Sequence, residues 1–94
     1  MGNGMQNLNE LNEITAKAVK SSGEIGEIVS LHREKANLTQ LELAKLSGVG
    51  KTVIFDIEKG KSTVKLETLF KVFKSLNITI ALDSPIIDAL VKSK

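Results

Sequence analysis

The stretch between residues 40 and 59, QLELAKLSGVGKTVIFDIEK, constrains the fold of this chain more than any other part. It holds two short runs whose apolar residues recur at helical spacing, joined across a glycine. Two short helices that cross steeply need a small residue where they approach, which Ala44 supplies, and a glycine that can turn, which Gly48 supplies. The apolar residues that would lock such a pair together are Leu43, Val49, Ile54 and Ile57. The stretch therefore predicts two packed helices joined by a tight turn.

The letters GVGKT within this stretch also suggest the end of a phosphate-binding loop, which would make the chain a nucleotide-binding enzyme. With Gly50 as the second glycine of such a loop, the first must stand at position 45, which is Lys45. A lysine there removes the tight turn that wraps a phosphate, and the residues before it are helix formers rather than a buried strand. Nothing in the sequence supplies a paired Mg²⁺ site. We therefore expect no enzymatic activity and no cofactor.

Helical patterns continue on both sides of the central stretch. Capping boxes mark two helix starts, one at residues 21–24 and one at residues 39–42. Asn37 and Gly60 suit the left-handed positions at which helices end. The predicted helices cover residues 22–35, 39–47, 50–59 and 66–76. The last of them has an expected apolar face formed by Leu66, Leu69, Phe70, Phe73 and Leu76.

The period of the apolar pattern changes after the fourth predicted helix. In NITIALD, Ile78, Ile80 and Leu82 alternate with other residues, which is typical of a strand. A single strand cannot satisfy its own backbone groups, so two copies of residues 77–83 are expected to pair antiparallel in a two-fold dimer. Pairing with the N-terminal segment of the same chain is the alternative. The expected organisation is a partly disordered arm at 1–20, a helical domain at 21–76, a dimerisation strand at 77–83 and a tail or short helix at 84–94.

Composition narrows the class of protein. The 94 residues suffice for one small domain, and the absence of cysteine with only one histidine excludes disulfides and leaves no metal site. The net charge is +2, but residues 35–74 hold eight lysines against four acidic residues. A DNA-binding protein would need such a basic region, although lysines that are simply solvated on the surface explain the excess of positive charge equally well. No apolar run reaches the roughly 18 residues of a membrane span, so we expect a soluble cytoplasmic protein without a membrane partner.

The run LTQLELAKLSGV followed by IEKGK, within residues 24–76, resembles the helix-turn-helix of the Cro/lambda-repressor-like (XRE) family. The continuation GKSTVKLETLFKVFKSLNITIAL looks like the HipB-like branch of that family. The resemblance implies a mainly α, lambda-repressor-like domain of four to five helices, followed by one C-terminal β-strand used for dimer pairing. It also implies an antitoxin that represses its own operon and binds a HipA-like kinase toxin. The expected partners are double-stranded operator DNA, a second copy of the chain and such a toxin.

Residues of the second helix of this motif carry the expected DNA recognition. Lys51 is suited to donate to guanine, Thr52 to several bases, and Phe55 to contact a thymine methyl, although Phe55 fits the core equally well. The expected base-reading residues are Lys51, Thr52, Phe55 and Asp56. The expected phosphate-contacting residues are Thr39, Gln40, Gly50, Lys59 and Lys61. The resemblance further implies an internal ion pair between Arg33 and Glu58, which would join the first helix to the third.

Two positions depart from the family pattern. The recognition helix commonly begins with Ser or Thr, and Gly50 in that place would lose a phosphate contact. Asp56 would repel phosphate unless it accepts a hydrogen bond from a cytosine amine. Two alternatives to the antitoxin therefore stay open: a stand-alone XRE regulator without a toxin, and a protein-interaction module that has lost DNA binding.

Overall fold

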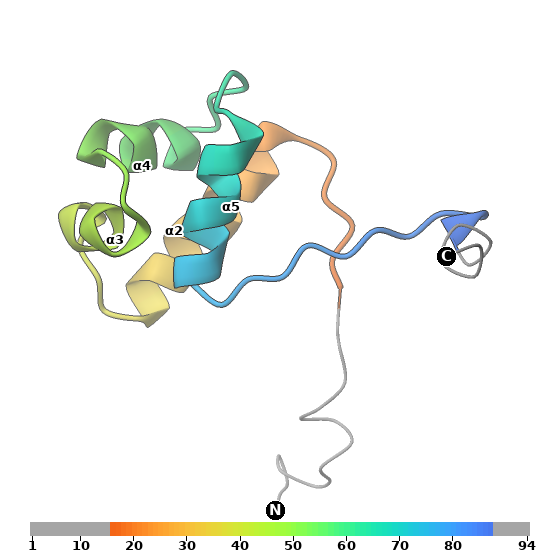
Figure 1. The fold of residues 1–94 in the computed structure, drawn as a ribbon, viewed down its shortest axis with the longest axis horizontal. Helices are drawn as coiled ribbons and strands as arrows, with labels where there is room; N and C mark the ends of the chain where they lie inside the picture. The colour runs from red at the N-terminus through yellow and green to blue at the C-terminus, as the bar shows by residue number, and fades with distance from the viewer. Residues whose placement is uncertain (1–15, 88–94) are drawn as a thin grey trace, which may run out of the picture.

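A computed structural model describes residues 16–87 of the chain, and within them it contains four helices (Figure 1). These are α2 (Ser22–Lys35), α3 (Gln40–Ser47), α4 (Lys51–Glu58) and α5 (Leu66–Ser75). The four predicted helices are confirmed, with small changes at the ends, where Gly50 and Lys59 cap α4 rather than belong to it. Helices α3 and α4 pack against each other, α2 packs on α4, and α5 packs on α3.

The turn between α3 and α4 forms for the local reasons that the sequence indicates. Thr39 Oγ1 accepts from the Glu42 amide at 3.0 Å, and Glu42 Oε1 accepts from the Thr39 amide at 2.8 Å, which completes the predicted capping box. Gly48 ends α3 with φ at 71°, in the left-handed region that favours glycine. The Val49 amide then donates to Ala44 O at 3.0 Å. The chain thus turns within a few residues and begins α4 directly.

Replacing Thr39 by alanine is expected to lower the free energy of unfolding by about 1 kcal/mol, because it removes the acceptor for a helix-start amide. Chemical denaturation followed by circular dichroism measures the change. Thr63→Ala, at an exposed position in the loop before α5, is the matched control and should leave the midpoint unchanged. Equal midpoints for the two variants would show that the capping box contributes nothing measurable.

The core lies where the four helices meet. Its fully buried large side chains are Val29, Leu43, Ile54 and Val72. The expected apolar face of α5 is partly wrong, because Leu66 and Phe70 are exposed and Val72 is buried instead. Val72, Phe73 and Leu76 form the buried side of α5, so Leu66 and Phe70 lie on its outer edge.

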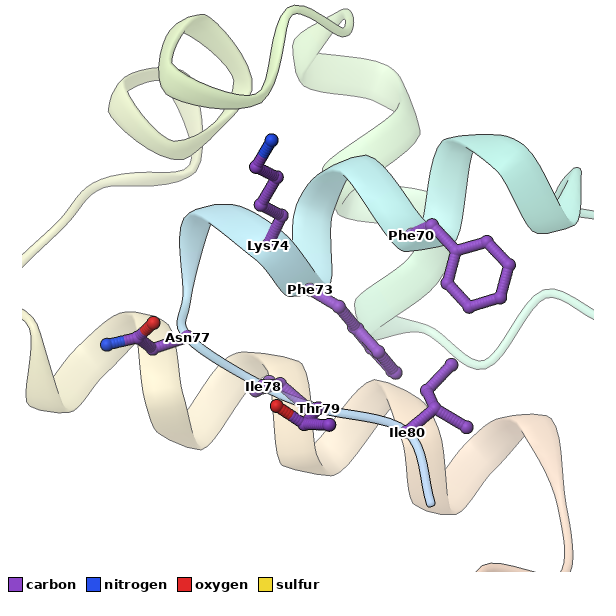
Figure 2. Close-up of a pocket in the computed structure, with 7 residues that line it drawn as sticks. All are labelled: Phe70, Phe73, Lys74, Asn77, Ile78, Thr79 and Ile80. Atoms are coloured by element: carbon purple, nitrogen blue, oxygen red, sulfur yellow. The ribbon is translucent and has the colours of Figure 1, made fainter. Parts of the chain in front are cut away.

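Residues 77–80 follow α5 as an extended chain and line a groove together with Phe70, Phe73 and Lys74 of that helix (Figure 2). Asn77, with φ at 62°, ends α5, and the Ile78 amide donates to Phe73 O at 2.9 Å. The side chain of Phe73 points toward this segment, and Ile80 lies near Phe70 across a groove of about 280 Å³. Within residues 16–87 the predicted strand forms no ladder. Because the expected pairing needs a second chain, it stays a prediction.

Both ends of the chain extend beyond the described part. Residues 16–20 are exposed and lie outside any helix, and the rest of the predicted arm, residues 1–15, is outside the described residues. Of the predicted C-terminal tail, residues 88–94 are likewise outside them. Within residues 16–87 no helix is long and apolar enough to cross a membrane.

Candidate nucleic-acid interface

Helix α4 presents one face to solvent and the opposite face to the core. Ile54 and Ile57 are buried, whereas Lys51, Thr52 and Phe55 are exposed. Phe55 is 47% exposed, so it is a surface residue and not part of the core. Side chains four positions apart are neighbours on a helix, so Lys51 lies beside Phe55 and Thr52 beside Asp56, and the two adjacent pairs form one polar and aromatic surface. We call this surface the α4 face.

Two lysines beyond the end of α4 contact the α4 face. The Lys59 ammonium lies 5.5 Å from the centroid of the Phe55 ring, within cation–π range. Lys61 Nζ lies 3.4 Å from Asp56 Oδ2, and both side chains are partly exposed. Lys61 therefore offsets the negative charge of Asp56, which reduces the repulsion that this carboxylate would exert on a phosphate.

Gly50 stands at the N-cap of α4 and provides no side-chain acceptor for the leading amides of that helix. Its φ of −79° is ordinary, and a Cβ built there would meet nothing within 4 Å. The backbone therefore does not require glycine at this position. A serine or threonine would fit, so the departure from the family pattern is chemical rather than steric.

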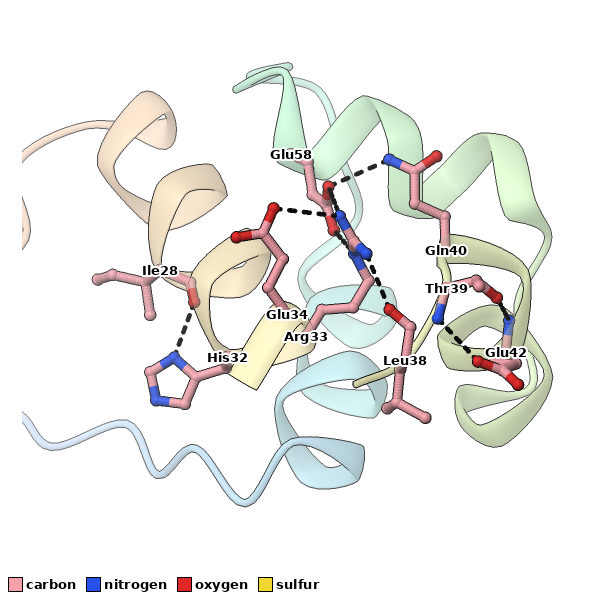
Figure 3. A network of polar contacts seen from close by, with 9 residues as sticks. All are labelled: Ile28, His32, Arg33, Glu34, Leu38, Thr39, Gln40, Glu42 and Glu58. Carbon is pink, nitrogen blue, oxygen red and sulfur yellow. Dashed lines mark hydrogen bonds and ion pairs between the residues drawn. The ribbon is translucent and has the colours of Figure 1, made fainter. Parts of the chain in front are cut away.

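An ion pair joins α2 to the last residue of α4 (Figure 3). Arg33 Nε donates to Glu58 Oε2 at 2.6 Å and Arg33 Nη2 to Oε1 at 3.1 Å. A third bond runs from Arg33 Nη1 to Leu38 O at 2.9 Å. The Arg33 and Glu58 side chains are only 15% and 9% exposed. The hydrogen bonds to Glu58 raise the pKa of Arg33, against the opposing effect of burial, so the guanidinium stays charged.

Gln40 is part of the same network. Its Nε2 donates to Glu58 Oε1 at 3.1 Å, so the Glu58 carboxylate accepts from α2 and from the start of α3 at once (Figure 3). The sequence predicts that Gln40 contacts a phosphate. It does not indicate the contact with Glu58, because 18 residues separate the two residues. The network therefore fixes three helices relative to one another. Thr39, beside Gln40, is exposed and uses its hydroxyl in the capping box.

Within the described residues no group of three His, Asp or Glu side chains could hold a metal ion. The α4 face has the starts of α3 and α4 beside it and lysines at its end. It combines donors, one acceptor and an aromatic ring on a helix whose opposite side is packed in the core through Ile54 and Ile57.

A sequence model of the helix-turn-helix family matches residues 31–82. The chain belongs to this family. An uncharacterized HTH-type transcriptional regulator, y4mF of Sinorhizobium fredii, is 37% identical over 70 residues, which cover 74% of this chain and 92% of the relative. The fold is similar to HipB in a HipA-HipB-O2-O3 complex and in a HipB-O4 20mer complex, each with a TM-score of 0.68 and 27% identity. Each of these matches covers 74% of this chain and 99% of the solved one.

These comparisons confirm the XRE-type helix-turn-helix with a HipB-like structure, which the sequence motif indicates. The chain is thus a helix-turn-helix transcriptional regulator of XRE type.

Proposed function

We propose that this regulator is a sequence-specific DNA-binding repressor that acts as a homodimer and inserts α4 into the major groove. The observation that carries the proposal is the α4 face: three exposed side chains able to contact bases lie opposite two buried isoleucines. The Arg33–Glu58 pair joins the last residue of the helix to α2, so the end of the face is organised before DNA arrives. A cytoplasmic location follows from this role.

In this proposal, each side chain of the α4 face contacts the edge of a base. Lys51 donates to guanine O6 and N7, and Thr52 donates to or accepts from several bases. Phe55 presses on a thymine methyl, with Lys59 stacked on its ring. Asp56, whose charge Lys61 offsets, accepts from the N4 amine of cytosine.

The residues around the α4 face contact the DNA backbone in this proposal. Thr39 and Gln40 stand where α3 begins, and Gly50 stands where α4 begins, so the free amides of both helix starts lie at the edge of the face. Gln40 uses its amide nitrogen on Glu58, which leaves its side-chain oxygen and backbone for the surroundings. Lys59 and Lys61 supply positive charge at the far end.

A more specific proposal is that this repressor is the antitoxin of a HipBA-like pair, represses its own operon and binds a HipA-like kinase toxin. Its support is the similarity to HipB in a HipA-HipB-O2-O3 complex. The test is to search the neighbouring genes for a HipA-like kinase and, where one is encoded, to co-express it with this protein and purify the protein by affinity. A kinase that co-purifies at a fixed ratio supports the antitoxin role. The absence of such a neighbour, or of binding to it, indicates a stand-alone regulator.

Replacing Lys51 by alanine is expected to cost about 1–3 kcal/mol of operator binding and to relax the preference at one base position, because it removes a base-edge donor. Lys61→Ala should instead weaken binding to all sequences alike and lower the salt slope by about one. Fluorescence anisotropy on selected and scrambled duplexes across a salt series measures both effects.

The two lysine variants control each other, because each loses one exposed cation from the same region. Equal, unselective losses from both would mean that Lys51 does not contact bases. Failure of the folded wild-type protein to bind any duplex would overturn the DNA-binding proposal and leave a protein-interaction module.

A further inference from the structure

The first turns of α2 lie directly against the backbone at the end of α4. Gly26, which is buried, is the point of closest approach. A Cβ built on Gly26 would fall well inside contact distance of Ile57 O and 2.9 Å from Glu58 O. Both atoms are backbone carbonyls, so no side chain can rotate away to make room. Any residue larger than glycine at position 26 therefore forces the two helices apart.

Two further contacts hold the start of α2 against the residues that follow α4. Ser22 Oγ donates to Gly60 O at 2.7 Å, which ties the start of α2 to the residue that ends the α4 region. Gly60 has a φ of 84°, and a Cβ built on it would lie 2.9 Å from Gly23 Cα. The backbone of residues 57–60 is thus held against α2 by a hydrogen bond and by two approaches that only glycine allows.

The position of this backbone determines where the α4 face lies. Glu58, which carries one of the carbonyls above Gly26, also receives the Arg33 guanidinium. Phe55 O accepts from the Lys59 amide at 3.0 Å, so Phe55 belongs to the same last turn. A displacement of that turn moves the aromatic ring and the base-reading side chains with it.

We infer that Gly26 is a positioning residue for DNA recognition: by allowing α2 to touch the carbonyls at the end of α4, it sets the tilt of the recognition helix. The inference rests on the proposed DNA-binding function. Non-bonded atoms normally lie about 3.5 Å or more apart, so an added methyl group displaces the end of α4 by roughly 1 Å. Hydrogen bonds to base edges tolerate only a few tenths of an ångström before they weaken.

A positioning role and a purely structural role predict different behaviour in the folded protein. If Gly26 only stabilises the fold, Gly26→Ala lowers the unfolding midpoint, but the molecules that remain folded choose DNA sequences as the wild type does. If Gly26 positions α4, the folded variant loses selectivity. The ratio of its affinities for two duplexes therefore separates the two roles.

The experiment compares Gly26→Ala with Gly23→Ala, a glycine in the same helix. A Cβ on Gly23 would meet only Ser21 Oγ at 3.7 Å, an ordinary contact. The probes are a duplex selected by the wild-type protein from a randomised library and a scrambled duplex of the same composition. Affinities are measured at fixed salt and at a temperature where circular dichroism shows every variant folded. We expect the selected-to-scrambled affinity ratio to fall about tenfold or more in Gly26→Ala and to stay within about twofold of wild type in Gly23→Ala.

Ser22→Ala is the second test and keeps the inference falsifiable if Gly26→Ala does not fold. It removes the bond to Gly60 O without introducing a clash, and we expect it to lower the affinity ratio about threefold or more. A folded Gly26→Ala with the wild-type ratio overturns the inference. So does an unchanged ratio in Ser22→Ala when Gly26→Ala is unfolded. A wild-type protein that shows no preference between the duplexes instead overturns the proposed function.

Discussion

Replacing Glu58 by alanine is expected to lower the free energy of unfolding by about 3–5 kcal/mol, because it leaves a buried guanidinium without its carboxylate. The Arg33 and Glu58 side chains are 15% and 9% exposed, so water can replace little of what is lost. Gln40 Nε2 also loses its acceptor. Denaturant unfolding monitored by circular dichroism measures the change.

Two further variants identify the source of this effect. Asp56→Ala breaks the partly exposed pair with Lys61 and should change stability by less than about 1 kcal/mol. Arg33→Met combined with Glu58→Leu removes both charges and should recover most of the loss, because no buried charge is then left unpaired. A Glu58→Ala loss below about 1 kcal/mol would mean that Arg33 finds solvent easily in the folded state.

The pH dependence of stability has a definite sign at Arg33. Its pKa in the folded state is raised above the ordinary value of an arginine, chiefly by the hydrogen bonds that it donates to Glu58. A group with a raised folded pKa contributes stability that is fully present below its unfolded pKa and is lost as the pH rises through the folded value. The Arg33 contribution is therefore complete near neutral pH and is lost only in strongly alkaline solution.

The features that the sequence predicts correctly depend on neighbours along the chain. The capping box of Thr39 and Glu42 involves residues three apart, and the turns at Asn37, Gly48 and Gly60 reflect the backbone preferences of single residues. Such signals do not depend on how the helices pack. The helices and the helix-turn-helix unit follow from them, and the motif indicates the family.

The features that the sequence does not predict depend on the angles between helices. Gln40 meets Glu58 across 18 residues, and Gly26 meets the end of α4 only because α2 crosses it there. The burial of Val72 in place of Phe70 likewise depends on how far α5 is rotated about its axis. No pattern of neighbouring residues in the sequence determines the angles between helices. The pairing of residues 77–83 is a further step removed, because it depends on a second chain.

The outer edge of α5 and the segment after it indicate how two chains would associate. Phe70, Ile80 and Leu82 are 48%, 42% and 77% exposed, and the first two border the groove of about 280 Å³ (Figure 2). Large apolar side chains gathered in this way are typical of an interface. We therefore keep the proposal that two copies of residues 77–83 pair antiparallel, with α5 packed beneath them.

Replacing Ile80 by aspartate is expected to convert the dimer to a monomer at tens of micromolar and to weaken operator binding about 100-fold or more. A charge within an apolar interface is unpaired there, so the dimer is lost. Without the dimer, the two copies of α4 no longer lie about 34 Å apart to bind both half-sites at once, and the gain from bivalent binding disappears. Light scattering measures the mass, and fluorescence anisotropy on the selected duplex measures the affinity.

Leu46→Asp is the matched control, because Leu46 is an exposed leucine on α3 that does not line the groove. It should remain a dimer and bind the duplex as the wild type does. A dimeric Ile80→Asp with full affinity would rule out the strand as the interface. It would then favour pairing of this segment with the N-terminal part of its own chain, since a strand takes its ladder hydrogen bonds from a neighbouring strand in either arrangement.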